Sequence, residues 1–246
     1  MSSFPKGIFV TGTDTGVGKT VVSAALAWTL KQSGKKVVVM KPVQTGTASA
    51  QLMDIEFVQR VIGTNYPIEE VCPYRFPHPL APSVAASLLG QKVDLGKIRS
   101  AFYKLYSTHE AVIVEGAGGL LVPITEDYLM SDLAFDLNLA LLIVIRPSLG
   151  TLNHTLLTVE SARARGLKVL GIVINRFPSN PDVAENTNPE LITKMTGEPL
   201  LGVFPSDPEI SVEEGRLGKL RDISSSCLSP EMGGTFSARD FLSKLK

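Results

Sequence analysis

The sequence has no excess charge of either sign and very little cysteine. Lysine and arginine number 24, aspartate and glutamate also number 24, and the formal net charge at pH 7 is +0. This balance argues against nucleic acid or an anionic membrane as a partner, because both attract basic proteins. The two cysteines, Cys72 and Cys227, lie far apart and form no CxxC pattern. They exclude a disulfide scaffold and predict free thiols in a reducing compartment.

Long apolar segments are lacking as well. The longest apolar run, residues 139–145, is far too short to cross a bilayer and is typical of a buried strand. No signal-peptide pattern precedes the first apolar run near the N-terminus. We therefore expect a cytoplasmic protein that binds neither membrane nor nucleic acid.

Short apolar runs instead alternate with segments of helical periodicity. The 246 residues, 44% of them hydrophobic, are enough for a single α/β domain over residues 1–246. The apolar, β-branched runs predict strands at 8–11, 36–40, 111–115, 139–145, 169–174 and 200–204. The segments between them predict helices at 20–32, 53–61, 84–89, 95–106, 132–137 and 152–165. This order predicts an α/β fold with a mostly parallel sheet and helices on both faces.

Two regions do not follow the alternation. Residues 177–190 are polar and rich in proline, and we expect a surface insertion there. The tail after Pro205 has no clear periodicity, and its segment "SSSCLSPEMGGTF" (224–236) is typical of a loop. Only "SARDFLSKLK" (237–246) predicts a last helix.

The first predicted strand and helix are joined by "GTDTGVGKT" (12–20). A turn of this kind directs several backbone N–H groups at one point, and glycines let the backbone approach a phosphate chain. Lys19 can reach the β- and γ-phosphates, and the hydroxyl of Thr20 can bind Mg²⁺. The first glycine, Gly12, stands one position earlier than in the common GxxxxGK[ST] pattern. The segment predicts a P-loop nucleotide-binding fold; the alternative is an ordinary glycine-rich turn with a solvated lysine.

Three charged residues outside this loop are further candidates for the site. Glu115 ends the apolar run 111–114 and precedes three glycines and an alanine, while Lys41 follows the run 36–40. Both belong at the edge of the sheet where ligands bind in open α/β folds. Asp54 begins a predicted helix, where a helix cap is the plain alternative. A strand-end glutamate and a solvated lysine are the corresponding alternatives for Glu115 and Lys41.

Four segments in this order resemble dethiobiotin synthetases: "GTDTGVGKT" (12–20), "KPVQTG" (41–46), "VEGAGG" (114–119) and "LGTLNHTLLT" (149–158). The resemblance runs from about residue 8 to residue 205. It implies ATP-dependent ring closure of 7,8-diaminopelargonic acid with CO₂ or bicarbonate to give dethiobiotin. One amine forms a carbamate, whose oxygen takes the γ-phosphoryl group of MgATP. The second amine then attacks the resulting carbamic-phosphoric anhydride, and ADP and phosphate are the by-products.

The resemblance also implies residue roles. Lys19 and Lys41 are the expected catalytic cations, and Thr20, Asp54 and Glu115 the expected Mg²⁺ ligands. Thr45 is expected to bind the substrate. The helix start at Gly150, Thr151, Leu152 and Asn153 is expected to bind the substrate carboxylate from the second subunit of a homodimer. The expected nucleotide-binding residues are Gly16, Val17, Gly18, Lys19, Thr20, Val21, Asp54, Glu115, Gly116, Ala117, Gly118, Asn175, Arg176, Pro205, Ser206 and Asp207.

Two other functions are possible for a P-loop chain. A ParA-like nucleotide switch usually has an extra lysine early in the loop, whereas residues 12–15 contain none. A P-loop amidating ligase needs a glutamine-hydrolysing cysteine, but Cys72 lies between Val71 and Pro73 without a glycine-rich turn. Both alternatives are therefore less favoured than the ring-closing ligase.

Overall fold

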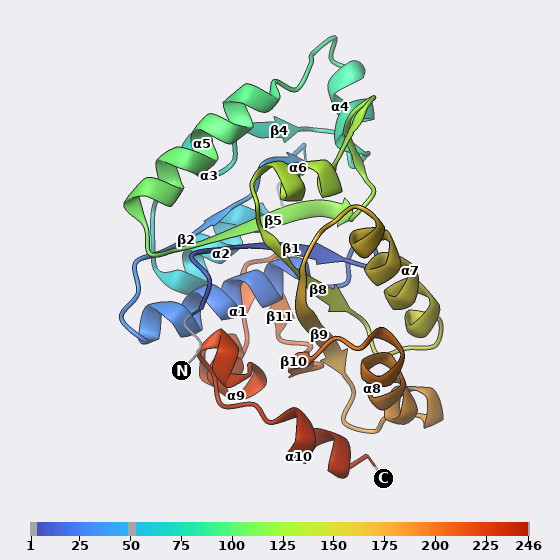
Figure 1. Ribbon diagram of the computed structural model, residues 1–246. Coiled ribbons are helices and arrows are strands. Elements are labelled where there is room, and N and C mark those ends of the chain that lie inside the picture. Colours follow the sequence, from blue (N-terminus) through green and yellow to red (C-terminus); the bar gives the residue numbers. More distant parts are fainter. Residues whose placement is uncertain (1–3, 49–52, 246) are drawn as a thin grey trace.

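The computed structural model describes residues 4–48 and 53–245 and contains a six-stranded, wholly parallel sheet (Figure 1). The strand order is β10-β9-β8-β1-β5-β2. The strands are β1 (Gly7–Gly12), β2 (Val37–Met40), β5 (Ala111–Gly119), β8 (Ala140–Ile145), β9 (Val169–Phe177) and β10 (Leu200–Pro205). Each contains one of the predicted runs or most of it. Their residues are largely buried because helices cover both faces of the sheet.

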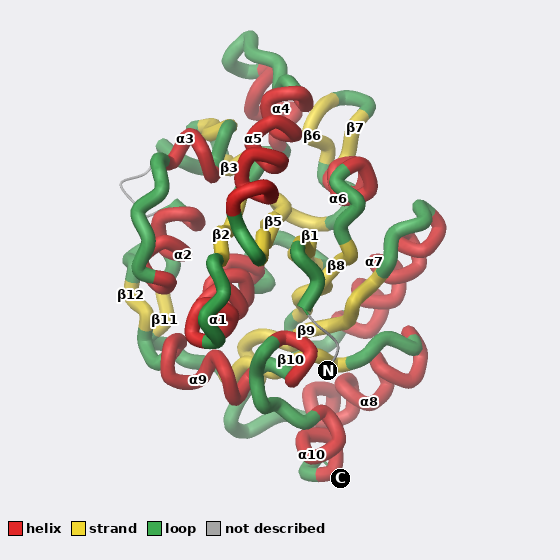
Figure 2. The backbone as a smooth tube through the Cα atoms, turned by 60° about the vertical axis from the view of Figure 1, so that its left-hand side comes forward, coloured by secondary structure: helices red, strands yellow, loops and turns green. Residues whose placement is uncertain are grey.

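The helices divide between the two faces (Figure 2). The chain crosses from β1 to β2 in one direction along the sheet, and its later crossovers to β5, β8, β9 and β10 run in the other. Since such crossovers are right-handed, the helix after β1 covers one face, and the crossover helices that lead into β5, β8, β9 and β10 cover the opposite face. Two further helices pack on the helix after β1 and share its face. On the first face lie α1 (Lys19–Gln32), α2 (Asp54–Ile62) and α9 (Leu220–Cys227); on the second lie α5 (Leu95–Thr108), α6 (Met130–Asp136), α7 (Thr151–Ala164) and α8 (Val183–Thr196). The predicted fold class is confirmed.

Shorter elements surround this framework. The helical ones are α3 (Ile68–Val71), α4 (Pro82–Ser87), α10 (Ala238–Ser243) and the 3₁₀ turn η1 (Pro230–Met232). The strand pairs are β3 (Val43–Thr45) with β4 (Tyr74–Phe76), β6 (Pro123–Thr125) with β7 (Tyr128–Leu129), and β11 (Ile210–Ser211) with β12 (Arg216–Leu217). Among the helices of residues 4–48 and 53–245, none has the length and apolarity needed to cross a membrane.

The polar stretch 177–190 differs from the expected surface insertion. Its second half is the start of α8, where Asp182 accepts a hydrogen bond from the N–H of Glu185 at 2.8 Å and the side chain of Glu185 accepts from the N–H of Asp182 at 3.0 Å. This capping box begins the helix despite Pro189 within it. The stretch therefore helps to form a regular crossover between β9 and β10.

The expected loop at 224–236 is wrong at its start. Residues 224–227 form the last turn of α9, whose Leu220, Ser224 and Cys227 are buried at helical spacing. Ser224 donates its hydroxyl hydrogen to the carbonyl of Leu220. Packing against α1 compensates for the low helix propensity of three successive serines. The predicted last helix is confirmed as α10.

Candidate functional site

The P-loop lies at the carboxyl end of the sheet, between the ends of β5 and β8, because β1 pairs with both. A Cβ on Gly12 would lie 2.6 Å from the Val17 side chain, so the loop needs a glycine where this sequence has one. Gly18 has φ +98°, and a Cβ there would lie 1.8 Å from Nδ2 of Asn175. Gly18 is thus fixed both by its backbone and by its neighbour. The displaced first glycine is accommodated at the end of β1.

Helix α1 begins directly after the loop and is buried along nearly its whole length. Val22, Ala24 and Leu26 have no exposed surface because α1 lies between the sheet and the helices α2 and α9. Lys19 and Thr20 stand in its first turn and line a cavity of about 330 Å³ at the end of the sheet. Their polar groups are therefore directed at this cavity, hereafter the cleft.

Four polar side chains meet on the floor of the cleft. Lys41 follows β2, Glu115 lies in β5, and the pairing of Met40 with Val114 brings them side by side. Nζ of Lys41 lies 2.6 Å from Oε1 of Glu115 and 2.7 Å from Oδ2 of Asp54. Oγ1 of Thr20 donates to the same Oε1 at 2.8 Å. Residues from α1, α2, β5 and the end of β2 thus form one cluster.

The charges in this cluster are unequally balanced. Burial alone would lower the pKa of Lys41, but the carboxylates of Asp54 and Glu115 outweigh it and raise that pKa. The ammonium of Lys41 in turn lowers the pKa of Asp54, against the effect of burial. Burial and the neighbouring Lys41 lower the pKa of Lys19 to about 8. Lys41 is therefore a permanent cation, while Lys19 lacks a full counter-charge that a phosphate would supply.

The cluster also fits a hard divalent cation. Oε2 of Glu115 is buried and has no hydrogen-bond partner within the described part of the chain. The hydroxyl of Thr20 and the carboxylates of Asp54 and Glu115 are oxygen ligands of the kind that Mg²⁺ prefers. An unpartnered buried carboxylate oxygen beside a P-loop threonine is the feature that a metal ion would satisfy.

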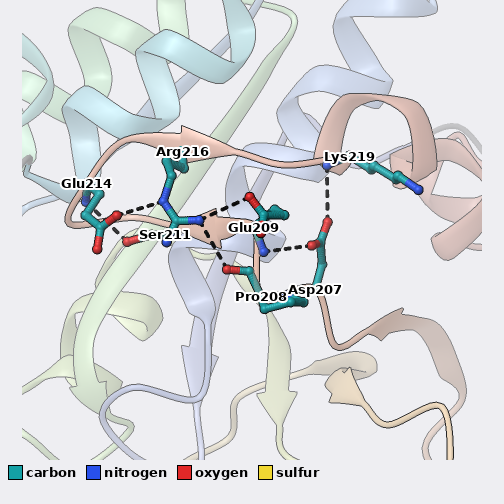
Figure 3. A network of polar contacts seen from close by, with 7 residues as sticks. All are labelled: Asp207, Pro208, Glu209, Ser211, Glu214, Arg216 and Lys219. Atoms are coloured by element: carbon teal, nitrogen blue, oxygen red, sulfur yellow. Dashed lines mark hydrogen bonds and ion pairs between the residues drawn. The ribbon is translucent and has the colours of Figure 1, made fainter.

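One wall of the cleft comes from the region after β10. Figure 3 shows the polar contacts within this region. Asp207 accepts hydrogen bonds from the N–H groups of Glu209 at 2.9 Å and Lys219 at 3.2 Å, which closes the hairpin β11–β12. Within it, Arg216 lies 2.7 Å from the carboxylate of Glu214. The hairpin adds four cleft residues that the sequence did not predict: Ile210, Ser211, Val212 and Glu213. Strands of two residues are too short for a periodic pattern in the sequence. The glycines at 215 and 218, which have positive φ, are the sequence signal for turns in this region.

Most of the predicted nucleotide residues line the cleft. Thr45 and the further residue Gln44 line it as well. The nucleotide set in its lining comprises Gly16, Gly18, Lys19, Thr20, Val21, Asp54, Glu115, Ala117, Gly118, Asn175, Arg176, Pro205 and Asp207. Val17 is buried beneath the loop, Gly116 packs on Phe9, and Ser206 bonds to the carbonyl of Phe177, so these three do not line it.

The start of α7 does not reach this cleft. Gly150 has φ +90° and precedes the helix, and Thr151, Leu152 and Asn153 form its first turn. None of these four lines the cleft of the same chain. Leu149, just before them, is 86% exposed, and Leu157, further along α7, is 57% exposed. The predicted carboxylate site is therefore apart from the predicted phosphate site within one subunit.

The chain matches the family described as AAA domain over residues 6–214. It is 48% identical over 196 residues to the ATP-dependent dethiobiotin synthetase BioD of Anaeromyxobacter sp. strain Fw109-5, which covers 79% of this chain and 88% of that protein. It is 44% identical over 209 residues to the protein of the same name from Bacillus subtilis strain 168, covering 85% and 90%.

Solved structures with a similar fold are more distant in sequence. The MinC:MinD cell division protein complex of Aquifex aeolicus has a TM-score of 0.58 at 14% identity, over 97% of this chain and 96% of that chain. The ParA family ATPase of Chlorobium tepidum TLS has a TM-score of 0.54 at 15% identity, over 98% and 99%. At such identities the likeness shows the fold alone, that of the P-loop ATPases.

Proposed function

Because the chain belongs to the family of ATP-dependent dethiobiotin synthetases, we propose that its cleft closes the ureido ring of dethiobiotin from 7,8-diaminopelargonic acid, CO₂ and ATP. The enzyme is an ATP-dependent ligase of biotin synthesis. One observation supports this reaction above all: Lys41 and Lys19 stand on the floor of one cleft with the oxygen ligands Thr20, Asp54 and Glu115. The ParA-like alternative is supported by distant structures such as those at 14% and 15% identity, which show the fold alone, and neither of the two relatives reported above is named as an amidating ligase.

The phosphates of ATP lie in this proposal on the P-loop. The N-terminus of α1 and the ammonium of Lys19 neutralise them, and Asn175, Arg176, Pro205 and Asp207 border the space left for the base and ribose. Thr20, Asp54 and Glu115 would hold Mg²⁺, which when bound neutralises charge on the β- and γ-phosphates.

Lys41 has a separate role in this proposal. It cannot serve as a general base, because the pKa of a lysine between two carboxylates is raised. It instead acts as a cation beside the carbamate oxygen that attacks the γ-phosphorus atom. It stabilises the negative charge on that oxygen while the P–O bond forms and ADP leaves. The second amine then attacks the carbamic carbonyl, the C–O bond to phosphate breaks, and the ring closes.

The remaining substrate contacts require a second subunit. We propose a homodimer in which Gly150, Thr151, Leu152 and Asn153 of the partner bind the substrate carboxylate, while Thr45 of the first subunit bonds nearer the reacting end. The exposed Leu149 and Leu157 support an interface along α7. We further propose that residues 1–246 form one domain, since α9 packs on α1. Both described cysteines are free and buried, which supports the cytoplasm as its compartment.

The test is a set of omissions. The protein is incubated with MgATP, bicarbonate and the diamine, and ADP, phosphate and dethiobiotin are measured; each component, including Mg²⁺, is then left out in turn. The proposal expects equal amounts of the three products and none without the diamine. ATP hydrolysis that continues without the diamine would favour a nucleotide switch. Turnover that appears only when glutamine or ammonia is added would favour an amidating ligase.

A further inference from the structure

Every carbonyl of the P-loop from residue 14 to residue 17 accepts a hydrogen bond from a side chain. The four pairs are Lys19 Nζ to Asp14 O at 3.1 Å, Arg146 Nη2 to Thr15 O at 3.0 Å, Arg176 Nη1 to Gly16 O at 3.4 Å and Asn175 Nδ2 to Val17 O at 3.0 Å. Three of the four donors come from the carboxyl ends of β8 and β9, which lie on the same side of β1.

These contacts also orient the N–H groups of the loop. The described residues contain no cis peptide, and in a trans peptide the carbonyl of one residue points opposite to the N–H of the next. Carbonyls held at residues 15, 16 and 17 therefore turn the N–H groups of Gly16, Val17 and Gly18 away from the donors. Within the described chain, no group accepts a hydrogen bond from these three N–H groups. They remain available for an anion.

The preceding N–H group is used differently. The N–H of Thr15 donates to Oδ1 of Asp14 at 2.7 Å, so the open run of N–H groups begins after it. Arg146 donates to the carbonyl of Thr15, and this carbonyl is in the same peptide group as the N–H of Gly16. The first free N–H of the phosphate site and the Arg146 contact thus belong to one peptide group.

We propose that Arg146 is a positioning residue for the phosphate chain of ATP, an inference that rests on the proposed function. It does not line the cleft, and no role follows for it from the motifs of the sequence. It acts through the loop. Its guanidinium fixes the orientation of the peptide between Thr15 and Gly16, and it compensates the negative partial charge of the Thr15 carbonyl, which would otherwise repel the phosphates.

The conformation of Arg176 supports this arrangement. Its φ is +60°, and it is one of two residues other than glycine with positive φ in the described chain. The other is an asparagine, a type that tolerates this region, whereas arginine is disfavoured there. A disfavoured backbone at the end of β9 directs a second guanidinium to the next P-loop carbonyl, which is expected if the orientation of the loop matters more than local strain.

The experiment compares Arg146→Ala and Arg146→Lys with the matched control Arg99→Ala. Arg99 of α5 forms an exposed ion pair with Asp136 of α6, so its removal changes the net charge equally but leaves the loop intact. Binding of MgATP and of inorganic tripolyphosphate is measured by calorimetry, together with kcat, both KM values and thermal unfolding without ligand. Arg146→Ala should weaken both ligands about tenfold, with kcat at saturating ATP and the KM of the diamine changed less than about twofold.

Arg146→Lys should recover part of the affinity, since an ammonium can reach the same carbonyl with a single bond. Arg99→Ala should bind both ligands like the wild type. Undiminished affinity in Arg146→Ala would overturn the inference, and so would a loss of kcat at unchanged affinity, which would mean that Arg146 touches the transferring group. If the wild type binds tripolyphosphate but closes no ring, the proposed function fails while the role of Arg146 is still decided by the binding data.

Discussion

At the scale of single residues, the two lysines of the cleft have opposite environments. Lys19 is buried and forms no ion pair with a carboxylate of the described residues, and its pKa falls to about 8, whereas Lys41 lies between Asp54 and Glu115 and its pKa rises. A lysine that lacks a counter-charge favours a bound anion in the ground state. A lysine that is already balanced contributes where charge moves during the reaction.

Lys41→Gln should therefore lower kcat by about 10²-fold or more, a loss typical of an electrostatic contact made in the transition state. The affinity for ATP should stay within a few-fold, and the KM of the diamine should rise because its carbamate loses a cation. Steady-state kinetics and separate ATP-binding measurements test this. Normal turnover would show that Lys41 has only a structural role, and a loss confined to ATP affinity would place it in the nucleotide site.

The same substitution has a second consequence. It leaves the carboxylates of Asp54 and Glu115 together without their common cation, which should cost roughly 3 kcal/mol of folding stability. Added Mg²⁺ should restore much of this loss if these residues are its ligands. Thermal unfolding of Lys41→Gln with and without Mg²⁺ measures it, and Lys36→Gln on the surface is the control. A stability independent of Mg²⁺ would contradict the metal assignment.

At the scale of elements, the hairpin β11–β12 is a wall of the cleft that is attached to α2. Arg60 donates from Nη1 to the carbonyl of Gly215 at 3.1 Å, and α2 begins at Asp54. Arg221 of α9 reaches the same helix, donating to the carbonyl of Val61 at 2.8 Å. The wall of the cleft and a cluster carboxylate thus belong to connected elements.

Arg60→Ala should raise the KM of ATP several-fold, since a hydrogen bond from a charged donor to a carbonyl contributes about 1.5 kcal/mol or more where it is partly buried. The value of kcat should change little, because Arg60 touches no cleft residue that reacts. Arg216→Ala, within the hairpin and more exposed, should have a smaller effect. Equal KM values in Arg60→Ala and the wild type would show that the hairpin is positioned by other contacts.

A buried histidine, His109, follows the last residue of α5 and does not line the cleft. Nε2 of His109 lies 2.7 Å from the hydroxyl of Tyr66, and Nδ1 lies 2.9 Å from the carbonyl of Leu105. A neutral ring that donates from Nδ1 and accepts at Nε2 satisfies both contacts. Burial lowers the pKa of His109, and the nearby Lys36 adds to this effect.

Because the pKa of His109 is lower in the folded than in the unfolded chain, the unfolded chain binds more protons below pH 6.5. Stability should therefore fall as the pH drops below about 6.5 until the folded histidine titrates as well. His109→Gln should remove this part of the pH dependence, and His78→Gln, at an exposed position outside the proposed interface, is the matched control. Denaturant unfolding between pH 7.5 and 5 measures it; the same slope in wild type and His109→Gln would contradict the assignment.

At the scale of the whole molecule, the start of α7 does not line the cleft of its own chain. If the substrate bridges two subunits, two differently damaged chains should complement each other. Lys41→Gln removes a cation from the cleft, and Asn153→Asp places a negative charge where the partner would receive the substrate carboxylate. Each homodimer then has two defective sites, whereas each mixed dimer has one intact site.

Co-expression of the two variants should recover about a quarter of the wild-type activity, the share of intact sites expected for random pairing. Mixing without subunit exchange is the control and should recover none. If co-expression recovers no activity while both chains are folded and paired, the site lies within one subunit and the role proposed for the helix start at Gly150 is wrong.

The sequence by itself determined the six strands, most of the helices between them but not α8, the position of Lys19 and Thr20 at the start of α1, and that of Lys41 and Glu115 at strand ends. It could do so because β-branched runs and glycine-rich turns are local patterns, and residues at the carboxyl ends of parallel strands must share one edge of the sheet. It also placed Asp54 at a helix start, although a simple cap was equally consistent with the pattern.

Only the tertiary structure decided the rest. Asp54 is a cluster residue because Lys41 lies 2.7 Å away, and that distance depends on how α2 packs against α1. Arg146 and Arg176 became visible as donors to the P-loop only once β8 and β9 lay beside β1. The hairpin β11–β12 and the serine-rich α9 likewise form because they pack on elements far away in the sequence. Contacts between distant segments carry no periodic signal, which is the physical reason why the sequence alone could not predict them.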